Sequence, residues 1–460
     1  MGNKKNAWLK FDDTKKEEIF SFCEGYKKYI SDCKTERESI KEAISLAESK
    51  GYRDLKNVIS AGKSLKAGDK VYYNNMDKSL ALFLIGSESI ESGMRIIGSH
   101  VDSPRLDLKP NPLYEDSELS LMETHYYGGV KKYQWVTIPL ALHGVVVKKD
   151  GTKIDVVVGE EETDPVVMVS DLLIHLAAEQ QQKKAAEVIA GEDLNILVGS
   201  MPLEGEEKEA VKANILKLLK EKYDFEEEDF MSAEIEIVPA GKARDLGLDR
   251  SMVAGYGHDD RICAYTSLLA LLETENTKKT SVVLLVDKEE VGSIGATGMQ
   301  SRFFENAVAE LMDRVGEYSE LKLRRALANS KMLSSDVTAA FDPNYAGAYE
   351  KKNSAFFGNG LAFAKYTGAR GKSGCNDANA EFVAWLRNVM DENDVAYQMA
   401  ELGKVDQGGG GTIAYILAEY GMEVIDCGVA LQNMHAPWEV ASKVDIFETM
   451  RGYKAFLMAE

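Results

Sequence analysis

The chain has 460 residues and a formal net charge of −20, with 45% hydrophobic and 28% charged residues. This length suggests two or three domains, and the composition is that of an ordinary globular protein. The acidic balance argues against nucleic-acid binding, because few cations are left over to neutralise phosphates. No apolar run reaches the roughly 20 residues that a membrane span needs.

The N-terminal segment MGNKKNAWLKFDDTKKEE has neither an apolar core nor a small-residue cleavage site, so we expect no secretory signal. The cysteines are odd in number and form no CxxC pair: Cys23, Cys33, Cys263, Cys375 and Cys427. This pattern is typical of buried thiols in a reducing compartment. We therefore expect a cytoplasmic protein.

The first part of the chain predicts helices and then strands. Apolar residues three or four positions apart predict amphipathic helices over 15–29 and 36–48. Strands are predicted at 79–86 and 94–98. The second strand runs into the loop SHVDSP, residues 99–104.

Residues 110–240 are richer in strand-like sequence than the rest of the chain, which predicts an inserted domain. Strand-like sequence occurs in THYYGGVKKYQWVTIPLALHGVVV, in KIDVVVGE and at 233–240, and a helix is predicted over 171–189. After Gly255 strands and helices alternate, and the predicted strands are SVVLLV, KMLSSDV (331–337), AYQMAEL (396–402) and MEVIDCGVAL. The predicted helices span 261–272, 299–318, 378–390, 411–420 and 442–459. Such alternation indicates an α/β fold with helices on both faces of a sheet.

Histidine and carboxylate side chains recur where predicted strands end: His100, Asp102, Asp259, Asp260, Glu289, Glu290, Asp336 and, after the last strand, His435. In an open α/β sheet, functional groups collect beyond the carboxyl ends of the strands. Imidazole and carboxylate ligands suit zinc, manganese or cobalt. The pattern therefore predicts a metal site at this edge of the sheet.

The number of ligands is sufficient for two metal ions, which need a bridging carboxylate and terminal ligands for each ion. Asp259 is the expected bridge, with His100 and Asp336 on one ion and Glu290 and His435 on the other. Taken singly, each acid also fits a helix cap or a solvated loop; Asp259 suits an N-cap. Their occurrence at successive strand ends favours the metal.

Two carboxylates remain beside this set. Asp102, two residues after His100, is expected to accept a hydrogen bond from the second ring nitrogen and so fix its tautomer. Glu289 ligates nothing in this scheme, and we expect it to be the general base.

Seven segments between residues 99 and 440 resemble the aspartyl aminopeptidase-type metallopeptidases (metallopeptidase family eighteen), in their bacterial aminopeptidase branch: SHVDSPRLDLKP, HYYGG, DLLIHLA, GHDDRICAY, DKEEVGSIGATGMQS, SSDVTAAFDP and MHAPWE. The resemblance implies a mixed-sheet α/β/α catalytic domain of the zinc-exopeptidase type, residues 1–109 and 241–460. It implies a barrel- or sandwich-like oligomerisation domain, residues 110–240. It also implies two divalent ions per subunit, zinc first and manganese or cobalt as alternatives. The roles that it implies are metal ligation for His100, Asp259, Glu290, Asp336 and His435, catalysis for Glu289, and orientation of His100 for Asp102.

The resemblance also points to residues outside the metal set. His175 in DLLIHLA matches a family histidine that is thought to reach a neighbouring subunit's site, or to be an additional zinc ligand; helix propensity alone makes it core-facing. The segment FAKYTGARGKSGCNDANAEF is not a close match to the family. Within it, Lys365 falls near a family lysine that faces an acidic substrate side chain, and Arg370 and Lys372 are alternatives. The run QGGGGTIA resembles a family loop before a helix, which implies backbone N–H groups presented to a substrate carbonyl; the run is also compatible with a plain flexible loop.

We therefore predict a dinuclear aminopeptidase that removes N-terminal residues from peptides, with a preference for Asp or Glu. The resemblance also implies that it assembles into a homo-oligomer, a dodecamer. One alternative is a related tetrahedral aminopeptidase with broader or neutral preference. Another is a non-catalytic oligomeric metal-binding shell, which would leave Glu289 without a role.

Overall fold

A computed structural model describes residues 6–460 and divides the chain into two compact units. The first unit contains the residues up to Asp102, Ala243–Met434 and Glu439–Glu460, and the second contains Ser103–Lys242 and His435–Trp438. The first five residues of the N-terminal segment examined for a signal lie outside the described residues. The division falls before Ser103 and not at residue 110, because β5 (Arg105–Asp116) is one strand across that position.

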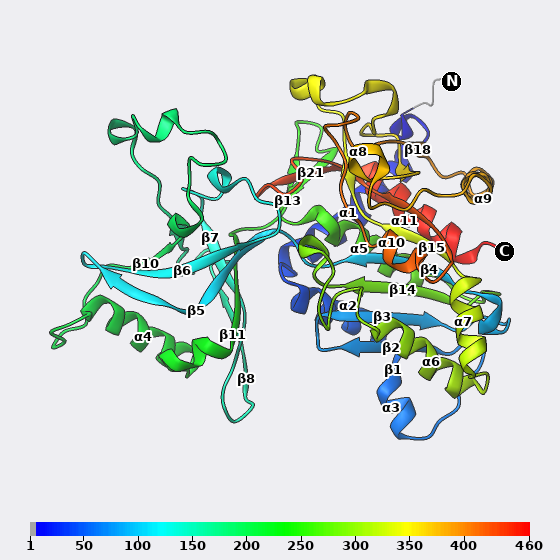
Figure 1. The fold of residues 1–460 in the computed structure, drawn as a ribbon, viewed down its shortest axis with the longest axis horizontal. Helices are drawn as coiled ribbons and strands as arrows, with labels where there is room; N and C mark the ends of the chain where they lie inside the picture. The colour runs from blue at the N-terminus through cyan, green and yellow to red at the C-terminus, as the bar shows by residue number, and fades with distance from the viewer. Residues whose placement is uncertain (1–5) are drawn as a thin grey trace. The chain divides into compact units, whose positions relative to one another are not determined.

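The first unit is built on a nine-stranded mixed sheet, in the order β1-β2-β3-β14-β4-β15-β19-β17-β18 (Figure 1). The strands are β1 (Arg53–Asp54), β2 (Lys70–Asn75), β3 (Ser79–Leu84), β4 (Arg95–His100), β14 (Ser281–Val286), β15 (Lys331–Ser335), β17 (Leu361–Ala364), β18 (Tyr397–Met399) and β19 (Glu423–Gly428). β4 is parallel to β14 and β15, and β15 is parallel to β19. The carboxyl ends of these four strands therefore lie along one edge.

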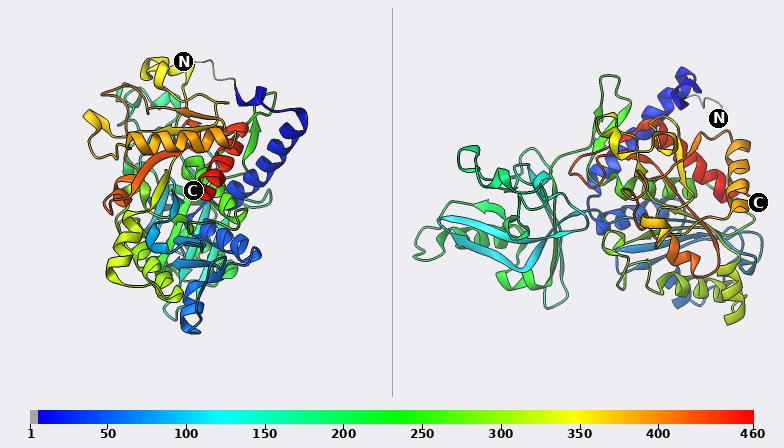
Figure 2. Two further views of the ribbon diagram at one scale, coloured as in Figure 1. Left: turned by 90° about the vertical axis from the view of Figure 1, so that its right-hand side faces the viewer. Right: turned by 45° about the horizontal axis from the view of Figure 1, so that its top comes forward.

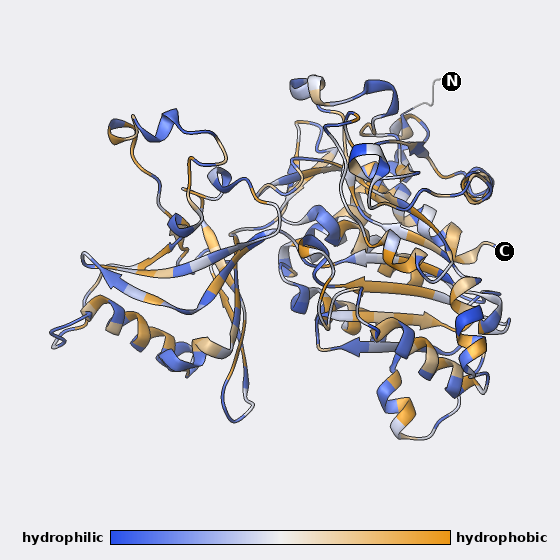
Figure 3. Ribbon diagram, in the orientation of Figure 1, coloured by the Kyte–Doolittle hydropathy of each residue, from blue (hydrophilic) through white to orange (hydrophobic). Residues whose placement is uncertain are grey.

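Helices cover both faces of this sheet, which confirms the predicted α/β/α fold (Figures 1 and 2). One face packs against α1 (Asp13–Asp32), α2 (Glu36–Ser49), α5 (His258–Leu272), α9 (Ala380–Glu392) and α11 (Lys443–Met458). The other packs against α3 (Leu55–Ser60), α6 (Phe303–Val315), α7 (Glu320–Ala328) and α10 (Ala414–Ala418). Because both faces are covered, β3 and β14 are nearly continuous apolar runs, as the orange colour of β14 in Figure 3 shows.

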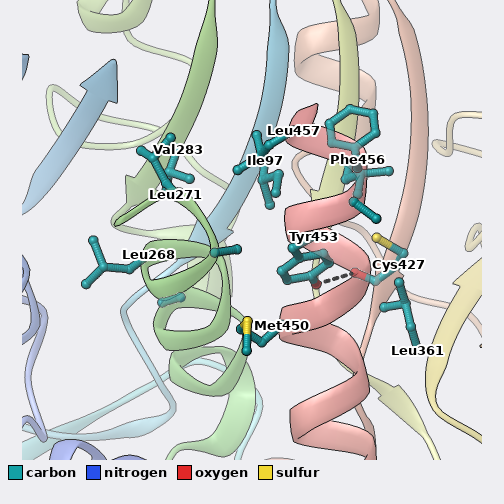
Figure 4. Packing of buried hydrophobic residues seen from close by; sticks show 14 of the residues in the cluster. Ile97, Leu268, Leu271, Val283, Leu361, Cys427, Met450, Tyr453, Phe456 and Leu457 are labelled. Atoms are coloured by element: carbon teal, nitrogen blue, oxygen red, sulfur yellow. Dashed lines mark hydrogen bonds between the residues drawn. The ribbon is translucent and has the colours of Figure 1, made fainter. Parts of the chain in front are cut away.

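Side chains of one strand alternate between the two hydrophobic clusters. In β14, Val283 faces the α5 and α11 side, whereas Val282 and Leu284 face the α6 side. Figure 4 shows Val283 beside Leu271 of α5. These clusters hold the strands firmly, so the groups at their carboxyl ends sit on a rigid support.

A five-stranded sheet completes the first unit. It consists of β12 (Arg244–Leu246), β13 (Met252–Gly255), β21 (Glu439–Ser442), β20 (Ala430–Gln432) and β16 (Thr338–Ala339), in that order. The predicted helix 299–318 is shortened to α6, because Gly316 adopts a left-handed φ of 79° and ends it. The predicted helix 411–420 is reduced to α10.

The second unit is β-rich, and its strands form one antiparallel sheet of seven strands, in the order β8-β7-β11-β5-β6-β10-β9. Besides β5 these are β6 (Leu119–Tyr127), β7 (Leu140–Val147), β8 (Lys153–Val158), β9 (Met168–Val169), β10 (Ile196–Gly199) and β11 (Ala233–Pro239). Helix α4 (Ala210–Tyr223) packs against β5, β6 and β10.

The prediction of a helix over 171–189 was wrong. The segment contains only two short 3-10 turns, Ile174–Leu176 and Gln180–Gln182. Leu173, Ile174 and Leu176 are exposed, so within this unit no neighbour buries an apolar helix face. A helix of this length is marginal without such packing.

None of the helices in residues 6–460 combines the length and the apolar character that crossing a bilayer demands. All five cysteines are free thiols, four of them buried and Cys375 half-buried.

Candidate metal centre

His100 is the last residue of β4, and its ring is buried with both nitrogens in use. Nδ1 lies 2.9 Å from the backbone carbonyl oxygen of Asp102 and 3.3 Å from Oδ1 of the same residue. A carbonyl oxygen can only accept a hydrogen bond, so Nδ1 carries a proton. In the neutral ring that a metal ligand requires, the lone pair is then on Nε2, on the other side of the ring.

Nε2 of His100 faces three carboxylates from three different segments of the chain. It lies 3.2 Å from Oδ1 of Asp259, 3.9 Å from Oε2 of Glu289 and 4.0 Å from Oδ1 of Asp336. Burial alone would lower the pKa of His100, but hydrogen bonds to Asp102 and Asp259 outweigh burial and raise it well above its usual value. The imidazole is therefore the centre of a strongly acidic cluster.

Asp259 and Asp260 occupy the first turn of α5, where the backbone is not helical. The turn follows Gly257, whose φ of 72° is left-handed, and the peptide bond between the two aspartates is cis. The N–H of Asp259 donates to Oε2 of Glu439 at 3.1 Å. Oδ2 of Asp260 accepts the N–H of His100 at 3.3 Å, so this second aspartate is tied directly to β4.

Glu289 and Glu290 lie in a single 3-10 turn, Glu289–Val291, just after β14. Left-handed residues flank the turn, Lys288 with φ 69° and Gly292 with φ 95°. The N–H groups of Glu289 and Glu290 donate to the two carboxylate oxygens of Asp102, at 3.1 and 3.2 Å. Asp102 therefore holds this turn beside the loop that follows His100.

Asp336 follows β15 and is fixed by the neighbouring strand β19. Its N–H donates to the carbonyl oxygen of Cys427 at 3.0 Å. At Gly428 a Cβ atom would lie 2.1 Å from the carbonyl oxygen of Asp336, so only glycine allows this approach. The pKa of Asp336 is raised well above its usual value, by burial and by the charges of Glu289, Asp259 and Asp426, against the opposing effect of His100.

These side chains form two groups with ligand spacing that share His100. One is His100, Asp259 and Glu290, the other is His100, Asp260 and Asp336, and within each group the ligand atoms lie within 4.8 Å of one another. Burial and the charge of Asp336 raise the pKa of Asp260 well above its usual value. Like charges packed so closely need a compensating cation, and N/O donors of this kind suit zinc or a related divalent ion. The residues present therefore fit a metal centre.

His435 was predicted as a metal ligand, and His175 as a substrate contact or an additional ligand. Both histidines belong to the second unit. Nδ1 of His435 lies 3.0 Å from the carbonyl oxygen of Gly129 in that unit. His175 is exposed within the 3-10 turn Ile174–Leu176. Their roles at a metal or a substrate stay predictions.

The predicted substrate-binding cations lie near β17. Lys365 and Lys372 both form ion pairs with the carboxylate of Asp377, the second at 2.8 Å. Arg370 lines a pocket of about 220 Å³ together with Tyr366 and other residues of two loops. Lys365, which the resemblance favours, is therefore already paired with an acid of its own chain.

Two residues of the site had no role in the sequence-based scheme. Asp260 was recognised at its strand end, but nothing local shows that it meets the N–H of His100 from 160 positions away. Glu439 ends the MHAPWE segment and lies 180 positions from its partner Asp259. The only available signal for Glu439 was its place four residues after a predicted ligand.

Comparison with known proteins places this geometry in a family. Residues 29–457 match the model of the aminopeptidase I zinc metalloprotease family, M18. A probable M18 family aminopeptidase 1 of Clostridium acetobutylicum is 66% identical over 454 residues, which cover 98% of each chain. The crystal structure of an M18 aminopeptidase from Thermotoga maritima superposes with a TM-score of 0.95 at 46% identity, over 99% of each chain.

A more distant structure, the mApe1 dodecamer of S. cerevisiae, is 20% identical, has a TM-score of 0.77 and covers 95% of this chain and 96% of its own. That likeness shows the fold alone. The family model and the Clostridium relative each span nearly the whole chain. This chain belongs to the M18 family of zinc metalloproteases and is a metallo-aminopeptidase.

Proposed function

We propose that this aminopeptidase uses two metal ions and that Glu289 is its general base. The observation that carries the dinuclear centre is the number of possible ligands: one imidazole and the four carboxylates of Asp259, Asp260, Glu290 and Asp336 fall into two overlapping groups, which is more than one four-coordinate ion needs. In the proposed arrangement His100 and Asp336 hold one ion, Glu290 and His435 hold the other, and Asp259 bridges them. Because the matching family is described as one of zinc metalloproteases, zinc is the first candidate for the metal.

When bound, the two cations supply Lewis acidity toward the scissile carbonyl and the attacking water, and an anchor for the free α-amino group that restricts cleavage to N-termini. The chain itself supplies the proton transfers. The Glu289 side chain is 15% exposed, so water can reach it. Its carboxylate accepts the proton of the attacking water and then delivers it to the leaving amine.

We further propose a preference for N-terminal Asp or Glu, with Lys365 or Arg370 receiving the acidic side chain. The cations near β17 support this reading, although Asp377 competes for Lys365. A charge-assisted hydrogen bond contributes about 1.5–3 kcal/mol, or roughly 10- to 100-fold in kcat/KM. Removing the correct cation should lower turnover of acidic N-termini by that factor and leave neutral N-termini unchanged.

The test is a panel of peptides that begin with Asp, Glu, Leu or Lys, each assayed with zinc, manganese and cobalt. Lys365→Met and Arg370→Met are compared with Lys404→Met, because Lys404 is a lysine that lines the pocket of Arg370. An acid preference that is lost in Lys365→Met or Arg370→Met, and kept in Lys404→Met, supports the proposal. A wild-type preference for Leu favours the alternative of a related aminopeptidase with neutral specificity.

We also propose that the second unit mediates self-association in the cytoplasm, with peptides as the other partners. The exposed apolar residues Leu173, Ile174 and Leu176 support an interface there. A dodecamer, as in the S. cerevisiae protein with the same fold, is the expected assembly. Light scattering coupled to gel filtration gives the subunit number, and a monomer at micromolar concentration would contradict this proposal. Full metal occupancy without turnover of any N-terminus would instead support the non-catalytic shell.

A further inference from the structure

The turn Glu289–Val291 belongs to a loop, residues 287–300, that closes on itself. Its two sides meet in an isolated parallel β-bridge between Asp287 and Gly298. At Gly298 a Cβ atom would lie 2.3 Å from the carbonyl oxygen of Ser293, so the returning side of the loop packs tightly against the residues that follow the turn. The backbone of the turn therefore depends on what holds the two sides together.

A buried side-chain hydrogen bond joins the two sides beside this bridge. Thr297 donates from Oγ1 to Oδ2 of Asp287 at 2.6 Å, and Asp287 and Thr297 are 0% and 4% exposed. Within residues 6–460, Oδ1 of Asp287 has no hydrogen-bond partner, and Nζ of Lys288 lies 3.6 Å from Oδ2. A buried carboxylate is costly when it lacks hydrogen bonds, so the hydroxyl of Thr297 stabilises this side chain and fixes its position.

Thr297 is itself attached to the central sheet. The hydroxyl of Ser79 donates to the carbonyl oxygen of Thr297, and Nδ2 of Asn75 donates to the carbonyl oxygen of Ala296 at 2.9 Å. Ser79 and Asn75 pair across the β2–β3 ladder, and β3 pairs in turn with β14, the strand that leads into the loop. The donor of the buried hydrogen bond therefore lies on a rigid support.

The residue between Asp287 and the turn adopts a conformation that costs free energy for any residue with a Cβ atom. Lys288 has φ 69° and ψ 15°, in the left-handed region. Such a conformation persists only where the surrounding structure imposes it. Asp287 fixes Lys288 from the preceding side, and the N–H of Ser293 donates to the carbonyl oxygen of Lys288 at 2.6 Å. Because Lys288 directly precedes Glu289 and Glu290, its conformation decides where their side chains point.

We propose that Thr297 is a positioning residue for the carboxylates of Glu289 and Glu290. Its hydrogen bond to Asp287 holds Lys288 in the left-handed conformation, and Lys288 sets the direction in which the two carboxylates leave the sheet. The inference rests on the proposed function, in which Glu290 holds metal and Glu289 is the general base. Both roles need a side chain held to within about 0.5 Å of its productive place, which a loop provides only when it is fixed from behind.

The first test removes the hydroxyl and keeps the shape of the side chain. Thr297→Val is compared with Thr274→Val, because Thr274 is also buried and donates from Oγ1 to a carbonyl oxygen, that of Ala270 at 2.7 Å, beyond the end of α5 that is remote from Asp259. Both metal-free variants should lose stability in urea. Only Thr297→Val should lower metal affinity and kcat, each about tenfold or more, as is usual when a group that orients metal ligands is lost. Equal metal affinity and kcat in the two variants would overturn the inference.

The second test asks whether the hydrogen bond is responsible. Thr297→Ser keeps the hydroxyl and should restore metal affinity and kcat, and a loss as large as in Thr297→Val would refute the role of the hydrogen bond. Amide hydrogen exchange of residues 288–293 in the metal-free protein should be faster in Thr297→Val than in Thr274→Val. If Thr297→Val does not fold, Ser79→Ala, which releases only the carbonyl oxygen of Thr297, should shift exchange and metal affinity in the same direction, and wild-type values of both would overturn the inference.

These readouts separate the inference from the proposed function, because exchange and metal titration need no substrate. Wild-type turnover in Glu289→Gln would refute the general base and leave the exchange and metal-affinity results for Thr297 standing. Thr297→Val with the metal affinity of Thr274→Val would refute the positioning role and leave the general base standing.

Discussion

The carboxylate of Asp102 accepts the backbone N–H of Glu289 at 3.1 Å, across 187 positions of sequence. Its second oxygen accepts the N–H of Glu290, and its Oδ1 also lies 3.3 Å from Nδ1 of His100. One fully buried side chain thus connects the loop after β4 to the turn after β14. The sequence predicted that Asp102 orients His100. Its position shows that it also fixes the turn of Glu289 and Glu290.

We expect Asp102→Ala to lower metal affinity and kcat together by about 10- to 100-fold, as is usual when a group that orients metal ligands is removed. Asp102→Asn keeps one acceptor oxygen and should fall between this variant and the wild type. Metal titration and steady-state kinetics measure the two effects. Wild-type metal affinity and kcat in Asp102→Ala would show that neither His100 nor the turn depends on this carboxylate.

Glu289→Gln should lower kcat by about 10²- to 10⁴-fold, because proton transfer by a positioned base contributes about that much. Its metal content should be unchanged, since the proposed ligand is the neighbouring residue. Glu290→Gln is the matched variant and should lose metal. Metal analysis of both proteins beside their kinetics separates the two roles, and near-wild-type turnover by metal-loaded Glu289→Gln would remove Glu289 from the mechanism.

Glu439→Ala should destabilise the Asp259 turn. The buried N–H of Asp259 would lose its acceptor, at a cost of about 1–3 kcal/mol. Glu439→Gln retains an oxygen at the same place and should retain most of the stability and the metal affinity. Urea denaturation of the metal-free protein and metal titration provide the two readouts. Equal losses in Glu439→Gln and Glu439→Ala would mean that charge, and not the hydrogen bond to Asp259, is what matters.

Asp245 joins three cations and should make stability depend on pH. It lies 2.6 Å from Nζ of Lys27, 2.8 Å from Nζ of the fully buried Lys443 and 2.6 Å from Nε of Arg250. Burial alone would raise its pKa, but hydrogen bonds from the three cations outweigh burial and hold the pKa well below its usual value. Asp245→Asn leaves Lys443 buried without its counter-charge, which should cost about 3 kcal/mol at pH 7.

The sign of this pH dependence follows from the lowered pKa. The unfolded carboxyl, with a pKa of about 3.9, takes up a proton before the folded one does, so the stabilisation is complete above about pH 4 and is lost as pH falls below it. The difference in unfolding free energy between wild type and Asp245→Asn should therefore shrink in acid. Urea titrations of the metal-free proteins at pH 7 and at about pH 3 measure it. A difference independent of pH would contradict the ionised state of Asp245.

Much of the fold was predictable because it depends on local pattern. Apolar runs and helical spacing located β4, β14, β15 and β19, and the polar residues near their carboxyl ends marked the edge where the candidate metal ligands gather. The helix expected over 171–189 failed for a physical reason, since its apolar residues find no surface to pack against within their own unit.

The sequence by itself determined the α/β alternation and the set of imidazole and carboxylate donors. Strand periodicity and side-chain chemistry are local properties, so they can be read from the sequence directly. Only the tertiary structure decided which groups meet: Asp102 with the Glu289 turn, Asp260 with the N–H of His100, Glu439 with Asp259, and Lys365 with Asp377. Except for the last, these partners are more than 150 positions apart. Their contacts depend on strand order and packing, which no local pattern records.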